Sequence, residues 1–237
     1  MKTDTIAAIA TAVSDSGIGI IRISGEEAVS IADKSVRLGK GKKKLKDAES
    51  HTIHYGFVLD GERVLDEVMV SVMKAPRSYT AEDTVEINCH GGVLMVRRIL
   101  ETILKNGARM AEPGEFTKRA FLNGRIDLSE AEAVMDIIHA KNEYALEASV
   151  KQLKGFVSAK IKKLREEILY EIAFIESALD DPEHISLDGY PKRLKEKTDS
   201  VLEELRGLAL SADNGKILKE GINTVIVGKP NAGKSSL

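Results

Sequence analysis

The chain has 237 residues, of which 43% are hydrophobic and 30% are charged, and its formal net charge at pH 7 is −2. This composition is typical of a globular protein with one large or two ordinary domains, and it excludes a nucleic-acid partner recognised through overall positive charge. The single cysteine, Cys89, excludes an internal disulfide and favours the cytoplasm, and no apolar segment approaches the length of a membrane span.

Residues 1–116 alternate short apolar segments with turns, which predicts a small mixed sheet with helices packed against it. Strands are expected at residues 5–10, 17–23, 52–59, 64–73 and 84–89, and helices at residues 26–38 and 92–106. Asp60 and Gly61 lie between two of these strands and are typical of a tight hairpin turn with positive φ. The first domain is therefore predicted to be α+β.

Within residues 1–116, a run of lysines occupies positions 40, 42, 43, 44 and 46 beside two glycines. Such a run is usually a solvated loop, and contact with RNA is the alternative.

Residues 117–220 have the pattern of long helices. Ser129 and Glu132 have the spacing of a capping box, which predicts the start of one helix. Apolar residues then repeat every three or four positions along a second helix that ends before Pro182, and a third helix is expected at residues 191–210. The repeated residues are Val150, Leu153, Val157, Ile161, Leu164, Ile168, Ile172, Ile175 and Leu179. The second domain is therefore predicted to be all-α, and we expect further helices from outside this sequence to cover the apolar stripe.

Residues 228–235 fit the phosphate-binding pattern G-x-x-x-x-G-K-[ST] and directly follow the apolar run 224–227. In such a loop, backbone N–H groups surround the phosphates, Lys234 reaches the β- and γ-phosphates, and the Ser235 hydroxyl ligates Mg²⁺. An ordinary glycine turn is the alternative, which the preceding strand disfavours. We interpret residues 221–237 as the first strand and the P-loop of a GTPase domain.

Nucleotide hydrolysis also requires a second acidic metal ligand and a group that orients water, and both come from later elements of such a domain. We therefore expect residues 1–237 alone to contain no catalytic residue and neither to hydrolyse nor to bind a nucleoside triphosphate firmly. For the same reason we expect residues 1–237 to be a piece of a longer NTPase.

Several segments together resemble the MnmE (TrmE) family of tRNA modification GTPases, and they occur in the order of that family. They are residues 4–11, 17–25, 79–92, 113–128 and 228–237. The resemblance implies a folate-binding domain over residues 1–116, a helical domain over residues 117–220, and a GTPase domain that begins at residue 221 and is inserted in the helical domain.

The resemblance also implies site residues. The folate-binding residues would be Arg22, Glu86 and Arg125; the nucleotide-binding residues would be Asn231, Ala232, Gly233, Lys234, Ser235 and Ser236, with Asn231 as a potassium ligand and Ser235 as a magnesium ligand. We expect Glu86 to face the N–H groups of the pterin and the arginines to face oxygen atoms, with residues 90–92 letting the backbone approach the ligand. The family more often has lysine at position 125, and at positions 12–16 it typically has a turn that contains Pro-Gly-Arg-Gly.

The function implied is that of the GTPase subunit of a complex that places a carboxymethylaminomethyl-type group on the wobble uridine of certain tRNAs. The implied cofactors are 5-formyl- or 5,10-methylene-tetrahydrofolate, GTP, Mg²⁺ and K⁺. The implied partners are tRNA, an MnmG-type flavoprotein and a second copy of the chain, which would bind through the N-terminal domain. One alternative is a stand-alone folate-dependent one-carbon transferase or folate-binding module. Another is a GTPase of the ribosome-assembly type whose N-terminal half is only a scaffold.

Overall fold

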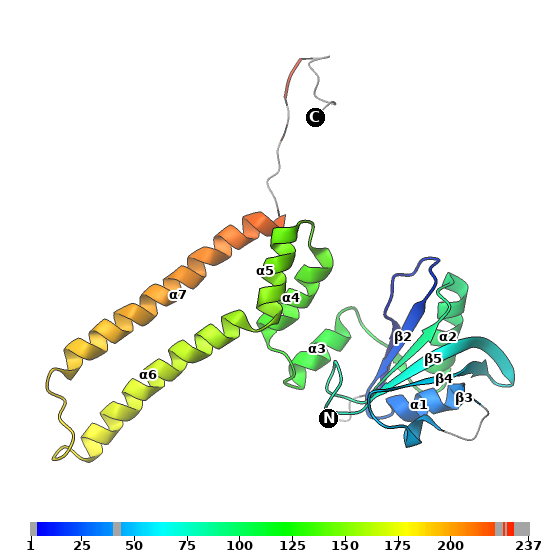
Figure 1. Ribbon diagram of the computed structural model, residues 1–237, viewed down its shortest axis with the longest axis horizontal. Coiled ribbons are helices and arrows are strands. Elements are labelled where there is room, and N and C mark those ends of the chain that lie inside the picture. The colour runs from blue at the N-terminus through cyan, green and yellow to red at the C-terminus, as the bar shows by residue number, and fades with distance from the viewer. Residues whose placement is uncertain (1–3, 40–43, 221–224, 226, 230–237) are drawn as a thin grey trace. The chain divides into compact units, whose positions relative to one another are not determined.

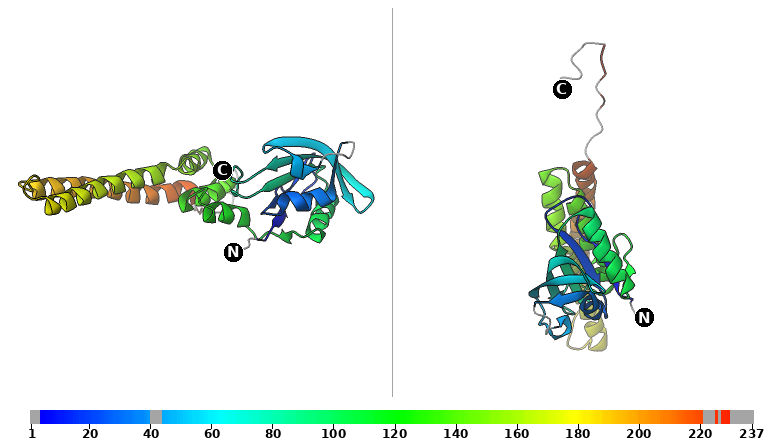
Figure 2. Two further views of the ribbon diagram at one scale, coloured as in Figure 1. Left: turned by 90° about the horizontal axis from the view of Figure 1, so that it is seen from below. Right: turned by 90° about the vertical axis from the view of Figure 1, so that its right-hand side faces the viewer.

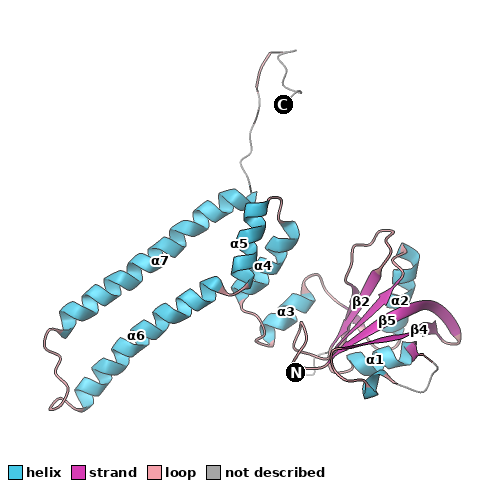
Figure 3. Ribbon diagram, viewed as in Figure 1, coloured by secondary structure: helices cyan, strands magenta, loops and turns pink. Residues whose placement is uncertain are grey.

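The computed structural model describes residues 4–39, 44–220, 225 and 227–229. The chain divides into an N-terminal unit, Met1–Asp127, and a helical unit, Leu128–Leu237. Figure 3 shows strands in the first unit and helices in the second. The predicted order of a mixed α+β domain followed by an all-α domain is therefore confirmed.

The N-terminal unit is built on one seven-stranded sheet with the order β3-β4-β5-β6-β2-β1-β7 (Figure 1). Every neighbouring pair is antiparallel except β1 and β7, which are parallel. The strands are β1 (Ile6–Ile9), β2 (Gly19–Ser24), β3 (Val36–Leu38), β4 (Thr52–Asp60), β5 (Arg63–Met73), β6 (Thr84–Cys89) and β7 (Arg109–Met110). The helices of this unit are α1 (Ala28–Ser35), the 3₁₀ turn Leu45–Asp47, α2 (Val93–Lys105) and α3 (Glu115–Leu122).

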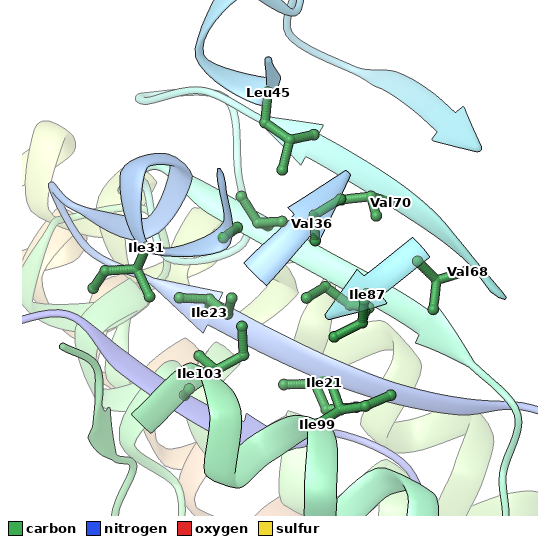
Figure 4. Close-up of a cluster of buried hydrophobic side chains, with 14 of the residues drawn as sticks. Ile21, Ile23, Ile31, Val36, Leu45, Val68, Val70, Ile87, Ile99 and Ile103 are labelled. Carbon is green, nitrogen blue, oxygen red and sulfur yellow. The ribbon is translucent and has the colours of Figure 1, made fainter. Parts of the chain in front are cut away.

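The alternation of side chains along β2 separates the hydrophobic core from the face that carries polar groups. Ile21 and Ile23 are fully buried and join Ile87 of β6 under the helices α1 and α2, which supply Ile31 and Ile99 to the same cluster (Figure 4). Because successive residues point to opposite sides of a strand, the residue between the two isoleucines points away from these helices. We call the side of the sheet opposite α1 and α2 the site face.

Two short strands were not predicted. The helix expected at residues 26–38 ends at Ser35, and Val36–Leu38 forms β3, where Val36 and Leu38 are buried and pair with β4. The two residues of β7 are too few to show any periodicity. In contrast, the hairpin at Asp60 is confirmed: Asp60 lies opposite Arg63, and Gly61 has a φ of 62°.

The domain boundary lies after Asp127 rather than after residue 116, where it was expected. The reason is that α3 is fastened to the N-terminal unit by ion pairs. Arg119 of α3 bonds to Asp4, which precedes β1, and to Glu82, which precedes β6.

The helical unit contains α4 (Leu128–His139), α5 (Glu143–Leu153), α6 (Phe156–Asp180) and α7 (Tyr190–Glu220). The long helices α6 and α7 run side by side in Figures 1 and 2, and the ion pairs Lys160–Glu204 and Lys197–Glu167 show that they are antiparallel. Within the described residues, no helix has both the length and the apolar character needed to cross a bilayer.

Two details of the helical prediction are wrong. The expected continuous helix through residues 150–179 is interrupted at Gly155, whose φ of 74° is left-handed and ends α5 before α6 begins. Ser129 lies inside α4 and not ahead of it, so it does not occupy the cap position. The apolar stripe of α6 is only partly covered: Leu164 is 3% exposed, whereas Ile161 and Ile168 are 43% and 44% exposed.

Candidate functional site

Arg22 and Glu86 form an ion pair on the site face. Arg22 Nε donates a hydrogen bond to Glu86 Oε1 at 2.7 Å. The two residues meet because the antiparallel register of β2 and β6 places them directly opposite each other. Their side chains are 28% and 21% exposed, so the pair is partly shielded from water and still accessible from outside. Among the described residues, Arg22 donates through Nε only, so both of its Nη groups retain their N–H donors for another acceptor.

Tyr79 connects Arg125 to this ion pair. The guanidinium carbon of Arg22 lies 5.5 Å from the centroid of the Tyr79 ring, and that of Arg125 lies 5.2 Å from the same centroid. Phe116 places a second ring 5.5 Å from Arg22. Aromatic rings attract guanidinium groups at such distances. The three residues implied as folate-binding are therefore brought together, and we call Arg22, Tyr79, Glu86, Phe116 and Arg125 the Tyr79 cluster.

The turn after α3 determines where Arg125 lies. Gly124 has a φ of 71°, which ends the helix and reverses the chain. The side chain of Asn123 donates a hydrogen bond to the Thr80 carbonyl at 2.7 Å. Because Thr80 directly follows Tyr79, this bond holds the turn that carries Arg125 beside the ring with which Arg125 stacks.

A buried polar network lies behind the Tyr79 cluster. Arg119 Nη1 lies 3.2 Å from Glu82 Oε2, and both side chains are almost completely buried. Ser24 of β2 donates to the same Glu82 carboxylate at 2.8 Å and lies 2.7 Å from the Thr80 hydroxyl. Satisfied networks of this kind fix the relative positions of the segments that supply them. This network ties α3 and residues 80–82 to β2.

Glu115 shows how strongly charged this network is. It accepts hydrogen bonds from Arg109 at 2.7 Å and from Arg119 at 3.2 Å. The hydrogen bond from Arg109, the backbone N–H of Glu112 and the hydrogen bond from Arg119 lower the pKa of the Glu115 carboxyl to about 2, against the opposing effect of its burial. The carboxyl is therefore ionised at any physiological pH.

Gly91 packs against a loop of the chain itself, and the expected approach of residues 90–92 to a ligand stays a prediction. A Cβ atom at Gly91 would lie 2.2 Å from Ser16 Oγ and 2.5 Å from the Ser16 carbonyl oxygen, so Gly91 accommodates the chain's own loop. His90 is exposed, and its Nδ1 lies 2.7 Å from Asp66 Oδ1. The hydrogen bond to this carboxylate raises the pKa of His90.

The predicted nucleotide and metal sites cannot be placed. Residues Asn231, Ala232, Gly233, Lys234, Ser235 and Ser236 all lie outside the described residues. Their assignment as nucleotide ligands, with Asn231 for potassium and Ser235 for magnesium, stays a prediction.

Sequence reasoning did not single out Tyr79 or Phe116 as site residues. Both lie within segments that carry the family resemblance, residues 79–92 and 113–128. The signal that could have identified them is an aromatic residue that lies in such a segment and is not needed for the hydrophobic core. Each ring is half-buried, which fits a wall of the site better than a place in the hydrophobic cluster.

Comparison with protein families assigns both units. Residues 5–125 match the family described as GTP-binding protein TrmE N-terminus, and residues 128–233 match the MnmE helical domain. The border between these two matches coincides with the division after Asp127 seen in the structure. The whole Tyr79 cluster lies in the first match.

Curated relatives named tRNA modification GTPase MnmE match along essentially the whole chain. The protein of Lachnoclostridium phytofermentans is 58% identical over 237 residues, which cover 100% of this chain and 52% of the relative. Those of Geobacillus thermodenitrificans and Bacillus subtilis are 54% and 53% identical, with 99% of this chain and 51% of each relative covered. The chain thus spans about half the length of these relatives. By sequence and by the order of its domains, the chain belongs to the MnmE (TrmE) family of tRNA modification GTPases.

Proposed function

We propose that the N-terminal unit binds a reduced folate at the Tyr79 cluster and that this folate supplies a one-carbon unit for tRNA modification. The observation that carries the proposal is the convergence of Arg22, Glu86 and Arg125 on one face of the sheet. Two guanidinium groups and one carboxylate leave a net positive charge at this position. Such a cluster favours a ligand that is rich in oxygen acceptors and also has an N–H edge for the carboxylate.

The contact between Arg22 and Glu86 indicates which part of the folate they bind. Because the two side chains are hydrogen-bonded to each other, they reach the same part of a ligand and not its opposite ends. The 2-amino-4-oxo pteridine ring has N–H donors beside a carbonyl oxygen, so it offers partners to Glu86 and to the Nη groups of Arg22 together. The glutamate tail ends in two carboxylates, which the carboxylate of Glu86 repels.

Calorimetry with 5-formyltetrahydrofolate and the chain of residues 1–237 tests the site. We expect saturable binding, at least ten-fold weaker in Glu86→Gln, since a hydrogen bond to a charged group is worth about 1.5–3 kcal/mol. Glu62→Gln, in the exposed turn between β4 and β5, is the matched control and should bind like the unchanged protein. Equal affinity of Glu86→Gln and Glu62→Gln would overturn the assignment.

Competition by fragments tests the orientation of the ligand. A tetrahydropterin without the tail should displace 5-formyltetrahydrofolate, whereas p-aminobenzoylglutamate should not. The reverse result would place the tail at the Arg22–Glu86 pair and contradict the orientation.

For the longer protein we propose GTP hydrolysis that depends on Mg²⁺ and K⁺, with Lys234, Ser235 and Asn231 in the roles named above. The proposal extends to modification of the wobble uridine of certain tRNAs with an MnmG-type flavoprotein, to a homodimer formed through the N-terminal unit, and to a cytoplasmic location. What supports it is the printed name of the relatives together with their identity to this chain. Lys234→Ala in the full-length protein should abolish both GTP hydrolysis and the uridine modification, and retention of either would count against the proposal.

The match of residues 128–233 to the MnmE helical domain favours this function over a stand-alone folate-dependent transferase. A transferase of that kind would not require the helical unit. The discriminating measurement is dependence of tRNA modification on guanine nucleotide in the full-length protein.

A further inference from the structure

One aromatic ring in the N-terminal unit has two cations close to it, and they come from distant parts of the sequence. Tyr79 lies in the segment between β5 and β6, Arg22 comes from β2, and Arg125 follows α3. Both guanidinium carbons lie within 5.5 Å of the Tyr79 centroid. Because each guanidinium group lies so close to the same ring, the two groups lie in the same part of the fold.

The two arginines differ in what else holds them. Arg22 is anchored by its hydrogen bond to Glu86. Arg125 is an exposed residue in a turn, and the stacking on Tyr79 is the side-chain contact that the structure shows for it. A free arginine side chain populates many rotamers, and ordering it costs conformational entropy. Arg125 is therefore ordered by its contact with the Tyr79 ring, and without the ring it would be a mobile side chain.

Tyr79 is itself held in place independently of both arginines. Its hydroxyl lies 2.9 Å from Thr117 Oγ1 of α3. The next residue, Thr80, accepts a hydrogen bond from Asn123 through its carbonyl and lies 2.7 Å from Ser24 Oγ through its hydroxyl. The ring can therefore act as a fixed support and does not follow the movements of the cations beside it.

We propose that Tyr79 is a positioning residue that directs the guanidinium of Arg125 toward the same ligand position as Arg22. This role rests on the proposed folate site, but the ordering of Arg125 is a property of the protein without ligand. The ring acts through Arg125, and the hydroxyl serves only to hold the ring against α3.

The first test uses the protein without ligand. Arginine side-chain Nε–H signals, followed by NMR, should move for both Arg22 and Arg125 in Tyr79→Leu, because the ring current is lost. The signal of Arg125 should also narrow toward that of a freely rotating side chain. Tyr79→Phe keeps the ring and should leave both signals close to their original positions. An unchanged Arg125 signal in Tyr79→Leu would overturn the proposal, whether or not folate binds.

The second test is a double-mutant cycle of 5-formyltetrahydrofolate affinity. We expect Tyr79→Leu and Arg125→Ala each to weaken binding about ten-fold, and the double variant to be no weaker than the worse single variant, because Tyr79 acts through Arg125. Tyr79→Phe should stay within about two-fold of the original affinity, since the ring supplies the cation–π interaction. Additive losses in the double variant would contradict the positioning role.

Controls separate this proposal from general damage and from failure of the folate site. Tyr144→Leu removes an exposed tyrosine of α5 and should change neither the arginine signals nor the affinity. If Tyr79→Leu does not fold, Tyr79→Met supplies a second apolar side chain without a ring, and it should release Arg125 whereas Tyr79→Phe should not. Absence of folate binding by the unchanged protein would refute the proposed function, while the NMR result would still decide the role of Tyr79.

Discussion

Arg119 of α3 lies 3.2 Å from the carboxylate of Glu82, and the two side chains are only 8% and 11% exposed. Arg119 also pairs with Glu115, so its removal would leave two buried carboxylates with less compensating charge. Breaking a buried ion pair from one side typically costs about 3–5 kcal/mol. We expect Arg119→Met to lower the free energy of unfolding of the N-terminal unit by that amount, as measured by urea denaturation.

Arg98→Met is the matched control for this substitution. Arg98 is 58% exposed and pairs with Glu101 within α2 at 3.8 Å, a surface geometry that contributes about 0–1 kcal/mol. Comparable losses in the two variants would mean that the network behind the Tyr79 cluster does not stabilise the unit.

The depressed pKa of Glu115 predicts an acid-sensitive N-terminal unit. The carboxyl titrates near its ordinary value of 4.5 in the unfolded chain and at about 2 in the folded protein. Its contribution to stability is therefore complete above pH 4.5 and is lost as the pH falls from 4.5 toward 2. Urea denaturation at a series of pH values should show a decline over this interval that is smaller in Glu115→Gln. The same pH slope in both proteins would exclude Glu115 as its source.

The fold of the N-terminal unit could largely be predicted because alternation along the strands is a local property. Ile21 and Ile23 flank Arg22 in the sequence, and this pattern alone places a strand with one buried face. By contrast, β3 is stabilised by pairing with β4, and residues 36–38 continue the helical pattern that precedes them. Pairing with β4 therefore determines the secondary structure of a segment for which local propensity predicts a helix.

The site could be predicted only in part, for a similar reason. Arg22, Glu86 and Arg125 were identified through family resemblance, and their convergence depends on the register of β2 with β6 and on the turn after α3. No local pattern indicates that Tyr79 lies beside Arg22, because 57 positions of the sequence separate them. Gly155 differs from Tyr79, because a glycine is a recognisable interruption of a helical pattern. The apolar repeat on both sides of it nevertheless predicted one continuous helix.

Cys89 is predicted to resist thiol reagents in the folded protein. Its side chain is 4% exposed, and its Sγ donates a hydrogen bond to the Gly19 carbonyl. Burial, and to a smaller extent the negative charge of Asp66, raise the pKa of the thiol to about 11. The reactive thiolate is therefore scarce at pH 8. Because Cys89 is the sole cysteine, modification by 5,5′-dithiobis(2-nitrobenzoate) should be slow in buffer and fast in urea. Rapid modification in buffer would show that the end of β6 opens in the native state.

The break between α5 and α6 depends on Gly155, and a pair of glycine substitutions can demonstrate this. Gly155 has a φ of 74°, and a Cβ atom there would lie 3.3 Å from Glu130 Oε1. Holding an alanine in the left-handed region costs about 1–2 kcal/mol, so Gly155→Ala should destabilise the helical unit by about that amount. Gly207 lies inside α7, where a Cβ atom would meet nothing within 4 Å, and Gly207→Ala should stabilise the unit by about 0.5–1 kcal/mol, because alanine is the better helix former. Thermal unfolding followed by circular dichroism should therefore shift in opposite directions for the two variants. An unchanged or upward shift for Gly155→Ala would mean that the chain can join α5 and α6 without the left-handed residue.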